Sequence, residues 1–401
     1  MDANIVLGYL ISSIMILVGI AWISLIYGIL QYISKAPSLD KFENNFKGTP
    51  LVSVIIPARN ETENIARCLD SMLEQDYPNY EVLVINDSSE DDTGDIIKEY
   101  SKRSKKIIHI DADAKPDGWV GKNWACMEGV RIAKSDLLLF TDADTRHARN
   151  VITLTVNHLE SKGLDALTAL PRMRTRDFLT KITMPIISVF LHTRFSALQV
   201  NNPKKKMAYF VGGFFIIRRH VYEAVGMHEG VRSEIVEDGA LGRKVKDAGY
   251  KLLMVKGEHL IDALWARDPP TLWNALKRIM IPMYLQTPKL AIGLAVGLVF
   301  LLFLPFPLFI YGIVSFQPEP VKFIMLLSSA FALICAYIGV ALETTKGMNI
   351  HIKYVIFEPL GSLIVVGGLI AGILKAKKKS SVSWRGRTYD MRKYEQQGIS
   401  I

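Results

Sequence analysis

The sequence predicts an α/β domain with a mostly parallel sheet, flanked by transmembrane helices at both ends. From Pro50 to about Lys256, apolar strand-like runs alternate with segments of helical periodicity, as in a parallel sheet covered by helices on both faces. Long uncharged runs lie before and after this region. The predicted parts are an N-terminal transmembrane anchor (1–35), the α/β domain (50–288), C-terminal membrane helices (289–375) and a basic cytosolic tail (376–401).

The composition supports a soluble domain joined to membrane segments. Half of the 401 residues are hydrophobic and 22% are charged, and the mean hydropathy is +0.21. The formal net charge of +9 concentrates at Lys204–Lys206 and from Lys375 onward. No nucleic-acid-binding motif accompanies it, so the basic clusters favour an anionic cytoplasmic leaflet over a nucleic-acid partner. The three cysteines are too widely spaced for a disulfide framework or a zinc site, which suits a reduced, cytosol-facing domain.

The first apolar run, residues 4–34, contains no charged side chain and is long enough to span a bilayer. It lacks the basic start of a cleaved signal peptide, so an anchor is favoured. Lys35, Lys41 and Lys47 follow the run, whereas only Asp2 precedes it. The positive-inside rule therefore predicts a multi-pass protein of the cell membrane whose α/β domain faces the cytosol.

Three apolar runs follow the α/β domain, at 290–316, 322–342 and about 354–374. Pro305 and Pro307 predict a kink in the first of them. Three full spans would place the basic tail outside, against the charge rule. The uncharged stretch 359–374 is short for a span, so a re-entrant or shallow last segment with a cytosolic tail is favoured.

The α/β domain is predicted to alternate strands and helices along the chain. Helical periodicity follows a capping-type Asn60, and ligands of such sheets bind at the carboxyl ends of the strands. The expected strands are "LVSVIIPA" (51–58), "EVLVIND" (81–87), "KIIHIDA" (106–112) and "DLLLFTDAD" (136–144), and the helices are "ETENIARCLDSMLEQ" (61–75), "DTGDIIKEYSK" (92–102) and "GKNWACMEGVRIAK" (121–134).

Two carboxylates, Asp142 and Asp144, follow the apolar run 137–140 directly. A buried strand does not carry carboxylates without a partner. Such a D-x-D pair can hold Mg²⁺ or Mn²⁺, which in turn holds the phosphates of a substrate. The alternative is a solvated turn rich in aspartate.

Four stretches, in this order and spacing, resemble the family 2 glycosyltransferases of the GT-A fold, a Rossmann-like domain with a mostly parallel sheet. They are "VIIPARNETENI" (54–65), "VLVINDSSEDDT" (82–93), "LFTDADTRH" (139–147) and "VEDGALGRKVKDAGYK" (236–251). The resemblance covers residues 50 to about 285. It implies an inverting enzyme that takes a sugar from a UDP- or GDP-linked donor.

The resemblance also implies a role for each matching residue. Asp142 would lie near the ribose and sugar and contact the metal, and Asp144 would be the Mg²⁺ or Mn²⁺ ligand. Asp238 would be the general base, and Glu237 would orient the acceptor. The nucleoside pocket would be lined by Pro57, Ala58, Arg59, Glu61 and Asp87.

Each role has a structural alternative. Arg59 and Glu61 would also suit the start of the first helix, and Asp87 an aspartate turn. Glu237 and Asp238 would be favourable at any helix N-terminus.

Two glycine-containing stretches add candidates. "KPDGWVGKNWA" (115–125) opens a helix whose N-terminus suits phosphate, which makes Lys122 a nucleotide contact or, alternatively, a surface lysine. Its tryptophans are expected to pack the helix onto the sheet. In "YFVGGFFIIRR" (209–219), Gly212 and Gly213 would leave room for a sugar or acceptor ring, as the family resemblance implies; a plain β-bulge is the alternative.

Two segments bear on the acceptor. "LWNALKRIMIPMYLQ" (272–286) lacks the Q-x-x-R-W signature of processive relatives, which disfavours a polysaccharide synthase and leaves Arg278 as a pyrophosphate candidate. "SWRGRTY" (383–389) resembles an element of membrane glycosyltransferases associated with carotenoid and hopanoid pathways. Its Trp384, Arg385 and Arg387 favour a lipid-linked acceptor, or alternatively bind headgroups.

Two further segments and two histidines each have an alternative interpretation. The segments 184–199 and 271–286 are expected to be interfacial helices, with a domain-core helix as the alternative for the first. His147 or His259 would be a further ligand of the metal ion. The alternative is a histidine that is solvated or hydrogen-bonded within the protein.

The sequence thus predicts a membrane glycosyltransferase whose partners are a nucleotide sugar, the bilayer and a lipid or lipid-linked acceptor. The rivals are a polyprenyl-phosphate sugar synthase, a polysaccharide synthase and a non-catalytic scaffold.

Overall fold

The computed structural model describes residues 3–41, 46–264, 266–315, 317, 319–378, 381–384 and 386–390. These residues form two compact units, each assembled from separate stretches of the chain. The α/β unit contains 36–174, 197–265 and the described residues from 381 onward. The helical unit contains 3–35, 175–196 and 266–378. The segments 184–199 and 271–286 therefore fall wholly or largely in the helical unit.

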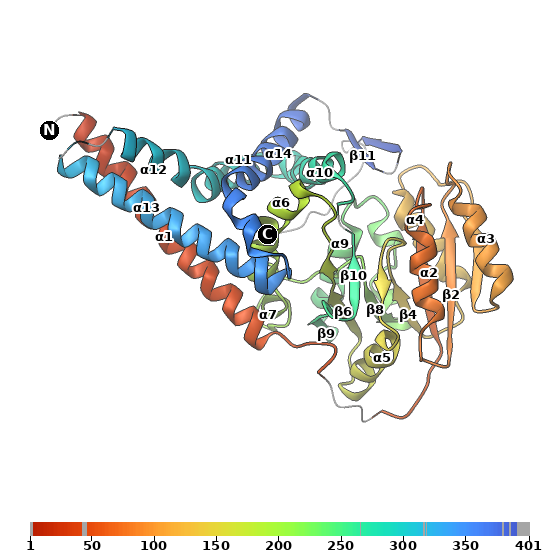
Figure 1. Ribbon diagram of the computed structural model, residues 1–401. Coiled ribbons are helices and arrows are strands. Elements are labelled where there is room, and N and C mark those ends of the chain that lie inside the picture. The colour runs from red at the N-terminus through yellow and green to blue at the C-terminus, as the bar shows by residue number, and fades with distance from the viewer. Residues whose placement is uncertain are drawn as a thin grey trace. The chain divides into compact units, whose positions relative to one another are not determined.

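Within its described residues, the α/β unit is built on a seven-stranded sheet in the order β3-β2-β1-β4-β8-β6-β9 (Figure 1). Strand β8 runs antiparallel to both of its neighbours, and all other neighbouring pairs are parallel. The predicted mostly parallel sheet is confirmed. The strands are β1 Val52–Ala58, β2 Tyr80–Asn86, β3 Ile107–Asp111, β4 Leu137–Phe140, β6 Ala166–Leu170, β8 Phe215–Arg218 and β9 Leu252–Lys256.

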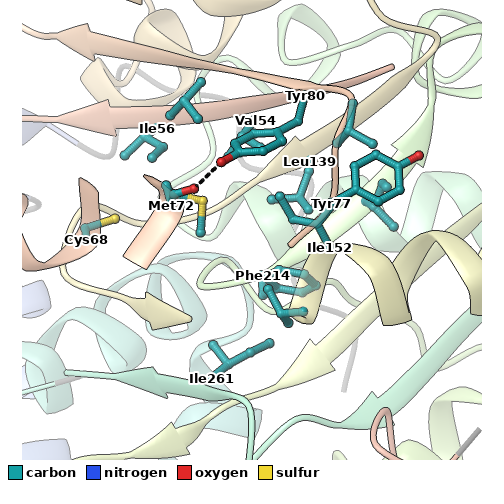
Figure 2. Packing of buried hydrophobic residues seen from close by; sticks show 14 of the residues in the cluster. Val54, Ile56, Cys68, Met72, Tyr77, Tyr80, Leu139, Ile152, Phe214 and Ile261 are labelled. Carbon is teal, nitrogen blue, oxygen red and sulfur yellow. Dashed lines mark hydrogen bonds between the residues drawn. The ribbon is translucent and has the colours of Figure 1, made fainter. Parts of the chain in front are cut away.

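Helices cover both faces of this sheet because apolar side chains alternate along its buried strands. Val54, Ile56 and Leu139 pack against α2, α3 and α5, and Figure 2 shows this cluster with Cys68 and Met72 of α2. The intervening residues of the same strands pack against α4, α8 and α9. The helices are α2 Ile65–Leu73, α3 Thr93–Arg103, α4 Gly121–Ile132, α5 Val151–Ser161, α8 Arg219–Ala224 and α9 Glu237–Asp247.

All four expected strands and all three expected helices of residues 51–144 are present, but the expected cap is wrong. Asn60 does not begin α2, which starts at Ile65 after Asn64. Asn60 adopts a left-handed backbone with φ of +53°, a conformation that asparagine tolerates better than most residues. Its side-chain oxygen accepts the N–H of Glu90 at 2.9 Å. Asn60 therefore ties two loops together instead of capping a helix.

Smaller elements complete the α/β unit. Three short strands form a second sheet in the order β5-β10-β7, and β11 and β12 form an antiparallel hairpin. The described residues of the tail segment that contains "SWRGRTY" thus form this hairpin and belong to the α/β unit. These elements are β5 Arg146–His147, β7 Arg172–Met173, α7 Ala197–Val200, η1 Glu229–Val231, β10 Ile261–Ala263, β11 Ser381–Trp384 and β12 Arg387–Asp390.

In the helical unit, α1 and α13 run side by side (Figure 1). Gly339 of α13 allows the Trp22 ring of α1 to approach, because a Cβ there would lie 2.7 Å from the ring. The Trp22 indole donates to the Leu301 carbonyl at 2.9 Å. The elements are α1 Ala3–Lys35, α6 Phe178–Thr193, α10 Pro269–Gln286, α11 Pro288–Leu298, η2 Val299–Phe303, α12 Pro305–Val314, α13 Pro320–Leu342, η3 Glu343–Gly347, η4 Ile352–Phe357 and α14 Glu358–Lys378.

Three helices in the described residues are long and apolar enough to cross a membrane: Ala3–Lys35, Pro320–Gly347 and Ile352–Lys378. The pair Pro288–Phe303 and Pro305–Val314 would be a fourth if taken as one span, and its 46° bend confirms the predicted kink. The last segment is longer than expected, because helical turns continue beyond the uncharged stretch on both sides. Its length suffices for a full crossing.

Candidate active site

The carboxyl ends of β1, β2 and β4 meet at one edge of the sheet, as parallel pairing requires. Ala58 pairs with Asn86 in register, and Ile55 pairs with Phe140. The Asp87 N–H donates to the Ala58 carbonyl at 2.9 Å. This edge therefore brings the turn after β1, Asp87 and the D-x-D segment after β4 into one region.

Lys122 joins three elements in this region. Its ammonium lies 2.8 Å from Asp142 Oδ1 and 2.8 Å from Glu237 Oε1. Lys122 stands in the first turn of α4 and Glu237 in the first turn of α9, whereas Asp142 follows β4. Burial alone would lower the pKa of Lys122, but Asp142, Glu237 and Asp238 together raise it well above its ordinary value. Lys122 is a cation held between two carboxylates with 15% of its side chain exposed, and it is not a surface lysine.

Asp238 lies beside this cation and accepts two backbone hydrogen bonds. Its Oδ2 accepts the Gly212 N–H at 2.7 Å, and its Oδ1 accepts the Gly239 N–H at 2.8 Å. Burial and the neighbouring Glu237 charge raise the pKa of Asp238 to about 7, although Lys122 and the Gly239 N–H oppose the shift. A group with such a pKa is poised to accept a proton near neutral pH.

The two glycines before β8 differ in their surroundings. A Cβ on Gly212 would lie 2.8 Å from Asp238 Oδ2 and 3.1 Å from Lys122 Nζ. A Cβ on Gly213 would meet nothing closer than 3.7 Å. The Gly213 carbonyl accepts the Thr141 hydroxyl at 2.8 Å. Gly212 is therefore needed for the close approach of Asp238 to the backbone.

Asp87 is buried at the end of β2 and pairs with the C-terminal hairpin. Arg387 Nη1 donates to Asp87 Oδ2 at 2.5 Å, and the Gly121 N–H of α4 donates to the Tyr389 hydroxyl at 3.2 Å. Burial raises the pKa of Asp87, whereas Arg387, Arg59 and Lys115 lower it. The aspartate turn is not its main role, because its carboxylate holds a guanidinium.

The turn after β1 is held by Arg59 and Glu61, and Pro57 and Ala58 are the last two residues of β1. Arg59 Nη1 donates to the Asp87 carbonyl at 2.7 Å and to the Ser88 carbonyl. The Glu61 carboxylate accepts the Asn64 side-chain amide at 3.0 Å. The Glu61 backbone carbonyl accepts the N–H groups of Asn64 and Ile65, so Glu61 serves the start of α2 with both its carboxylate and its carbonyl. The Arg59 side chain orders the loop that contains Asp87.

Asp142 and Asp144 offer oxygen ligands for a divalent cation. Burial raises the pKa of the Cys68 thiol of α2, and the charges of Asp144, Asp142 and Glu61 raise it further. No group of three or more His, Cys, Asp or Glu side chains in the described residues has the geometry of a metal site. Two carboxylates still fit Mg²⁺ or Mn²⁺, which take their remaining ligands from water and substrate phosphates.

Comparisons with known proteins identify the fold and the family of this region. Residues 53–226 match the family model described as glycosyl transferase family 2. This region therefore resembles the family 2 glycosyltransferases, as the sequence motifs predicted. The match contains Asp87, Lys122, Asp142 and Asp144, and it ends before Glu237 and Asp238.

Curated relatives agree with this assignment. The 4,4'-diaponeurosporenoate glycosyltransferase of Staphylococcus aureus strain bovine RF122 is 27% identical over 208 residues, which are 51% of this chain and 54% of the relative. The protein of strain MRSA252 is 28% identical over the same shares. The chain therefore matches about half the length of these relatives.

A solved structure shows the same fold over nearly the whole chain. The mannosyltransferase PcManGT from Pyrobaculum calidifontis, in complex with GDP-Man and Mn²⁺, aligns with a TM-score of 0.51 and 19% identity. The alignment covers 92% of this chain and 99% of that one. The α/β unit thus has the GT-A fold.

The two candidate histidines do not complete a metal site in the described part of this glycosyltransferase domain. His147 is buried in β5, where its Nε2 lies 3.0 Å from the Thr141 hydroxyl. Burial lowers the pKa of His147 to about 3, so it stays neutral. His259 is exposed in a turn before β10. The tryptophans before and in α4 are buried and pack edge to face, as expected.

Three other predicted residues belong to the helical unit or have side chains outside the described part of the tail. Arg278 lies in α10 of the helical unit. Arg385 and the side chain of Trp384 lie outside the described residues. Arg387, the tail candidate whose side chain is described, pairs with Asp87.

Sequence reasoning missed Tyr389, Lys115 and the pairing of Arg387 with Asp87. The signal was the tail stretch "SWRGRTY", whose glycine, aromatic and basic residues are typical of an ordered turn. Nothing in its spacing pointed to Asp87, which is 300 residues away.

Proposed function

We propose that this protein is a membrane-bound inverting glycosyltransferase. It transfers a sugar from a UDP- or GDP-linked donor to a lipid or lipid-linked acceptor, assisted by Mg²⁺ or Mn²⁺. The observation that carries the proposal is Asp238, a carboxylate fixed by two N–H groups with a pKa raised to about 7. It lies beside a lysine that also holds the carboxylate of the D-x-D segment.

The proposed reaction is a single displacement. Asp238 takes the proton of an acceptor hydroxyl, and the acceptor oxygen forms a bond to the anomeric carbon of the sugar. The bond between that carbon and the diphosphate breaks, and its electron pair leaves with the diphosphate. Configuration at the anomeric carbon inverts because attack and departure occur on opposite faces.

Charge control is the second part of the proposal. Asp142 and Asp144 would hold a divalent cation, which would neutralise the negative charge of the leaving diphosphate. Lys122 keeps Asp142 and Glu237 oriented through its two 2.8 Å contacts. Because its ammonium has three donors, it retains one for a donor phosphate oxygen. Glu237 would then orient the acceptor indirectly, through Lys122 and α9.

The membrane setting supports a lipid acceptor. Three helices are long and apolar enough to span a bilayer, and the side chains of Leu7, Leu17 and Tyr27 on α1 are more than half exposed. The basic residues after α1 favour a cytosolic glycosyltransferase domain. Cytosolic nucleotide sugars would then meet an acceptor held in the membrane.

The test is nucleotide-sugar turnover by the purified protein in lipid extract with Mn²⁺, with UDP- and GDP-sugars assayed side by side. Asp238→Asn and Asp144→Asn should both lose at least about a hundredfold in rate, the typical scale for general-base and metal-ligand losses. Asp247→Asn is the matched control, because it removes the same charge from the exposed end of α9. Loss of activity in both variants, together with an active Asp247→Asn control, would support the mechanism.

Other results would select a rival. If Asp238→Asn keeps its activity while Asp144→Asn fails, the acceptor arrives already ionised, as in a polyprenyl-phosphate sugar synthase. A polymeric product would indicate a polysaccharide synthase. If no donor binds or reacts, with or without metal, the enzyme proposal fails and a scaffold role takes its place.

A further inference from the structure

The C-terminal hairpin contacts two parts of the proposed donor site and lies close to a third. Arg387 reaches Asp87 at the end of β2, and Tyr389 accepts the Gly121 N–H of α4. At the hairpin turn, a Cβ on Gly386 would lie 3.8 Å from the side-chain amide of Asn60, in the turn after β1. Because the hairpin lies next to all three elements, it is positioned to form part of the proposed site.

The hairpin is tightly fitted at Gly121. A Cβ on Gly121 would overlap Arg387 Nη1 and lie 2.6 Å from Asp87 Oδ2 and 3.2 Å from the Tyr389 hydroxyl. Tyr389 is 3% exposed, and the Arg387 side chain is 21% exposed. Arg387 is thus held in place by Asp87, while part of its side chain is still exposed to solvent.

The charges around Asp87 favour an anion. Three cationic side chains, Arg387, Arg59 and Lys115, act on this one buried carboxylate. Burial lowers the pKa of Lys115, and repulsion by Arg387 lowers it further. The other nearby carboxylates, Glu90 and Asp117, are exposed and therefore screened by water. Three partly exposed cations thus surround one buried carboxylate.

We propose that Arg387 is a diphosphate-binding residue of the donor site and that Asp87 positions it. A guanidinium has five N–H donors in a planar fork, so it can keep its bond to Asp87 and still bind phosphate oxygens with its other edge. This inference rests on the proposed function. It gives Asp87 a positioning role, in place of the contact with the base or ribose that the family resemblance implies.

The experiment is calorimetric titration of the full-length protein in detergent with UDP, GDP and the matching nucleosides. Arg387→Gln should weaken the diphosphate that the wild type binds about ten- to a hundredfold, because one charge-assisted contact is lost. Affinity for the nucleoside should change less than about twofold, because the lost contact is to phosphate. Arg103→Gln, on the exposed end of α3, is the matched control.

The role of Asp87 is tested in the same titration. Asp87→Asn should weaken diphosphate binding in the wild type but have little further effect in the Arg387→Gln background, since it acts through Arg387. Tyr389→Phe removes the acceptor of the Gly121 N–H and should leave the diphosphate affinity within about threefold, because a neutral hydrogen bond contributes little. Arg387→Lys, with an intermediate loss, replaces Arg387→Gln if that variant does not fold.

Three results would overturn the inference. An unchanged diphosphate affinity in Arg387→Gln would leave the hairpin a structural element. A tighter affinity would mean that the hairpin competes with the nucleotide. Equal losses for diphosphate and nucleoside would show general damage to the site. If the wild type binds no nucleotide at all, the proposed function itself fails, and the inference falls with it.

Discussion

Replacing Lys122 by methionine removes the cation that three carboxylates share, and it keeps the length of the side chain. Removing one partner of a buried ion pair costs about 3–5 kcal/mol, because the other charge is left uncompensated. Asp142 is 35% exposed and partly screened, whereas Glu237 is 7% exposed. The loss should therefore come mainly from Glu237 and lie near the lower end, at about 3 kcal/mol at pH 8.

The loss in Lys122→Met should depend on pH with a definite sign. The pKa of Asp238 is already raised to about 7 by burial and Glu237. A carboxyl group with a raised pKa stabilises the fold below its ordinary pKa, and this contribution disappears as the pH rises through the folded value. Without Lys122, which lowers the pKa of Asp238, this carboxyl group should titrate at still higher pH. The variant should therefore recover part of its lost stability at pH 5.

The assay is urea unfolding in detergent at pH 5 and pH 8, followed by the fluorescence of the tryptophans next to Lys122. The change in unfolding free energy relative to wild type is compared at each pH, so that global acid effects cancel. Lys102→Met, on the exposed end of α3, should cost less than about 0.5 kcal/mol at either pH. A loss in Lys122→Met below about 1 kcal/mol, or one equal at both pH values, would refute the reasoning.

Two further outcomes follow from the site. Gly212→Ala would place a Cβ 2.8 Å from Asp238 Oδ2, so its turnover rate should fall at least about tenfold. Gly213→Ala, whose Cβ would meet nothing closer than 3.7 Å, should keep a turnover rate within about twofold of wild type. Equal rates for the two variants in steady-state assays would contradict this. Turnover should also rise with pH through about 7, because Asp238 must lose its proton to act as a base and its pKa is raised to that value. A pH–rate profile that is flat between pH 5.5 and 8.5 would exclude that role.

The edge of the sheet where the site lies was predictable from the sequence. Parallel strands end at the same edge, so polar residues that directly follow buried runs must come together. Asp87 and Asp142 do so because β1 lies between β2 and β4. The strand order itself was not needed for this conclusion, and the D-x-D segment fell where its preceding strand required.

The contacts between distant segments were not predictable. Lys122 meets Glu237 only because α4 and α9 both begin near the same strand ends, a consequence of loop paths that have no local sequence signal. The pair of Asp87 and Arg387 joins two segments of the α/β unit that are 300 residues apart in the sequence. The two adjacent glycines indicated open space around Gly212. They did not indicate that Asp238 needs this space to accept the Gly212 N–H.

The state of Asp238 bears on the acceptor more directly than any other feature. A phosphate or carboxylate acceptor is already ionised at neutral pH and has no proton to lose, so a base beside it would add only repulsion. A hydroxyl acceptor needs a base, and a carboxylate of ordinary pKa would be a weak one. Burial and Glu237 raise the pKa of Asp238, while Lys122 and two N–H groups keep its anion available. This balance favours an acceptor that binds as a neutral hydroxyl, and the acid limb of the pH–rate profile is where the difference would appear.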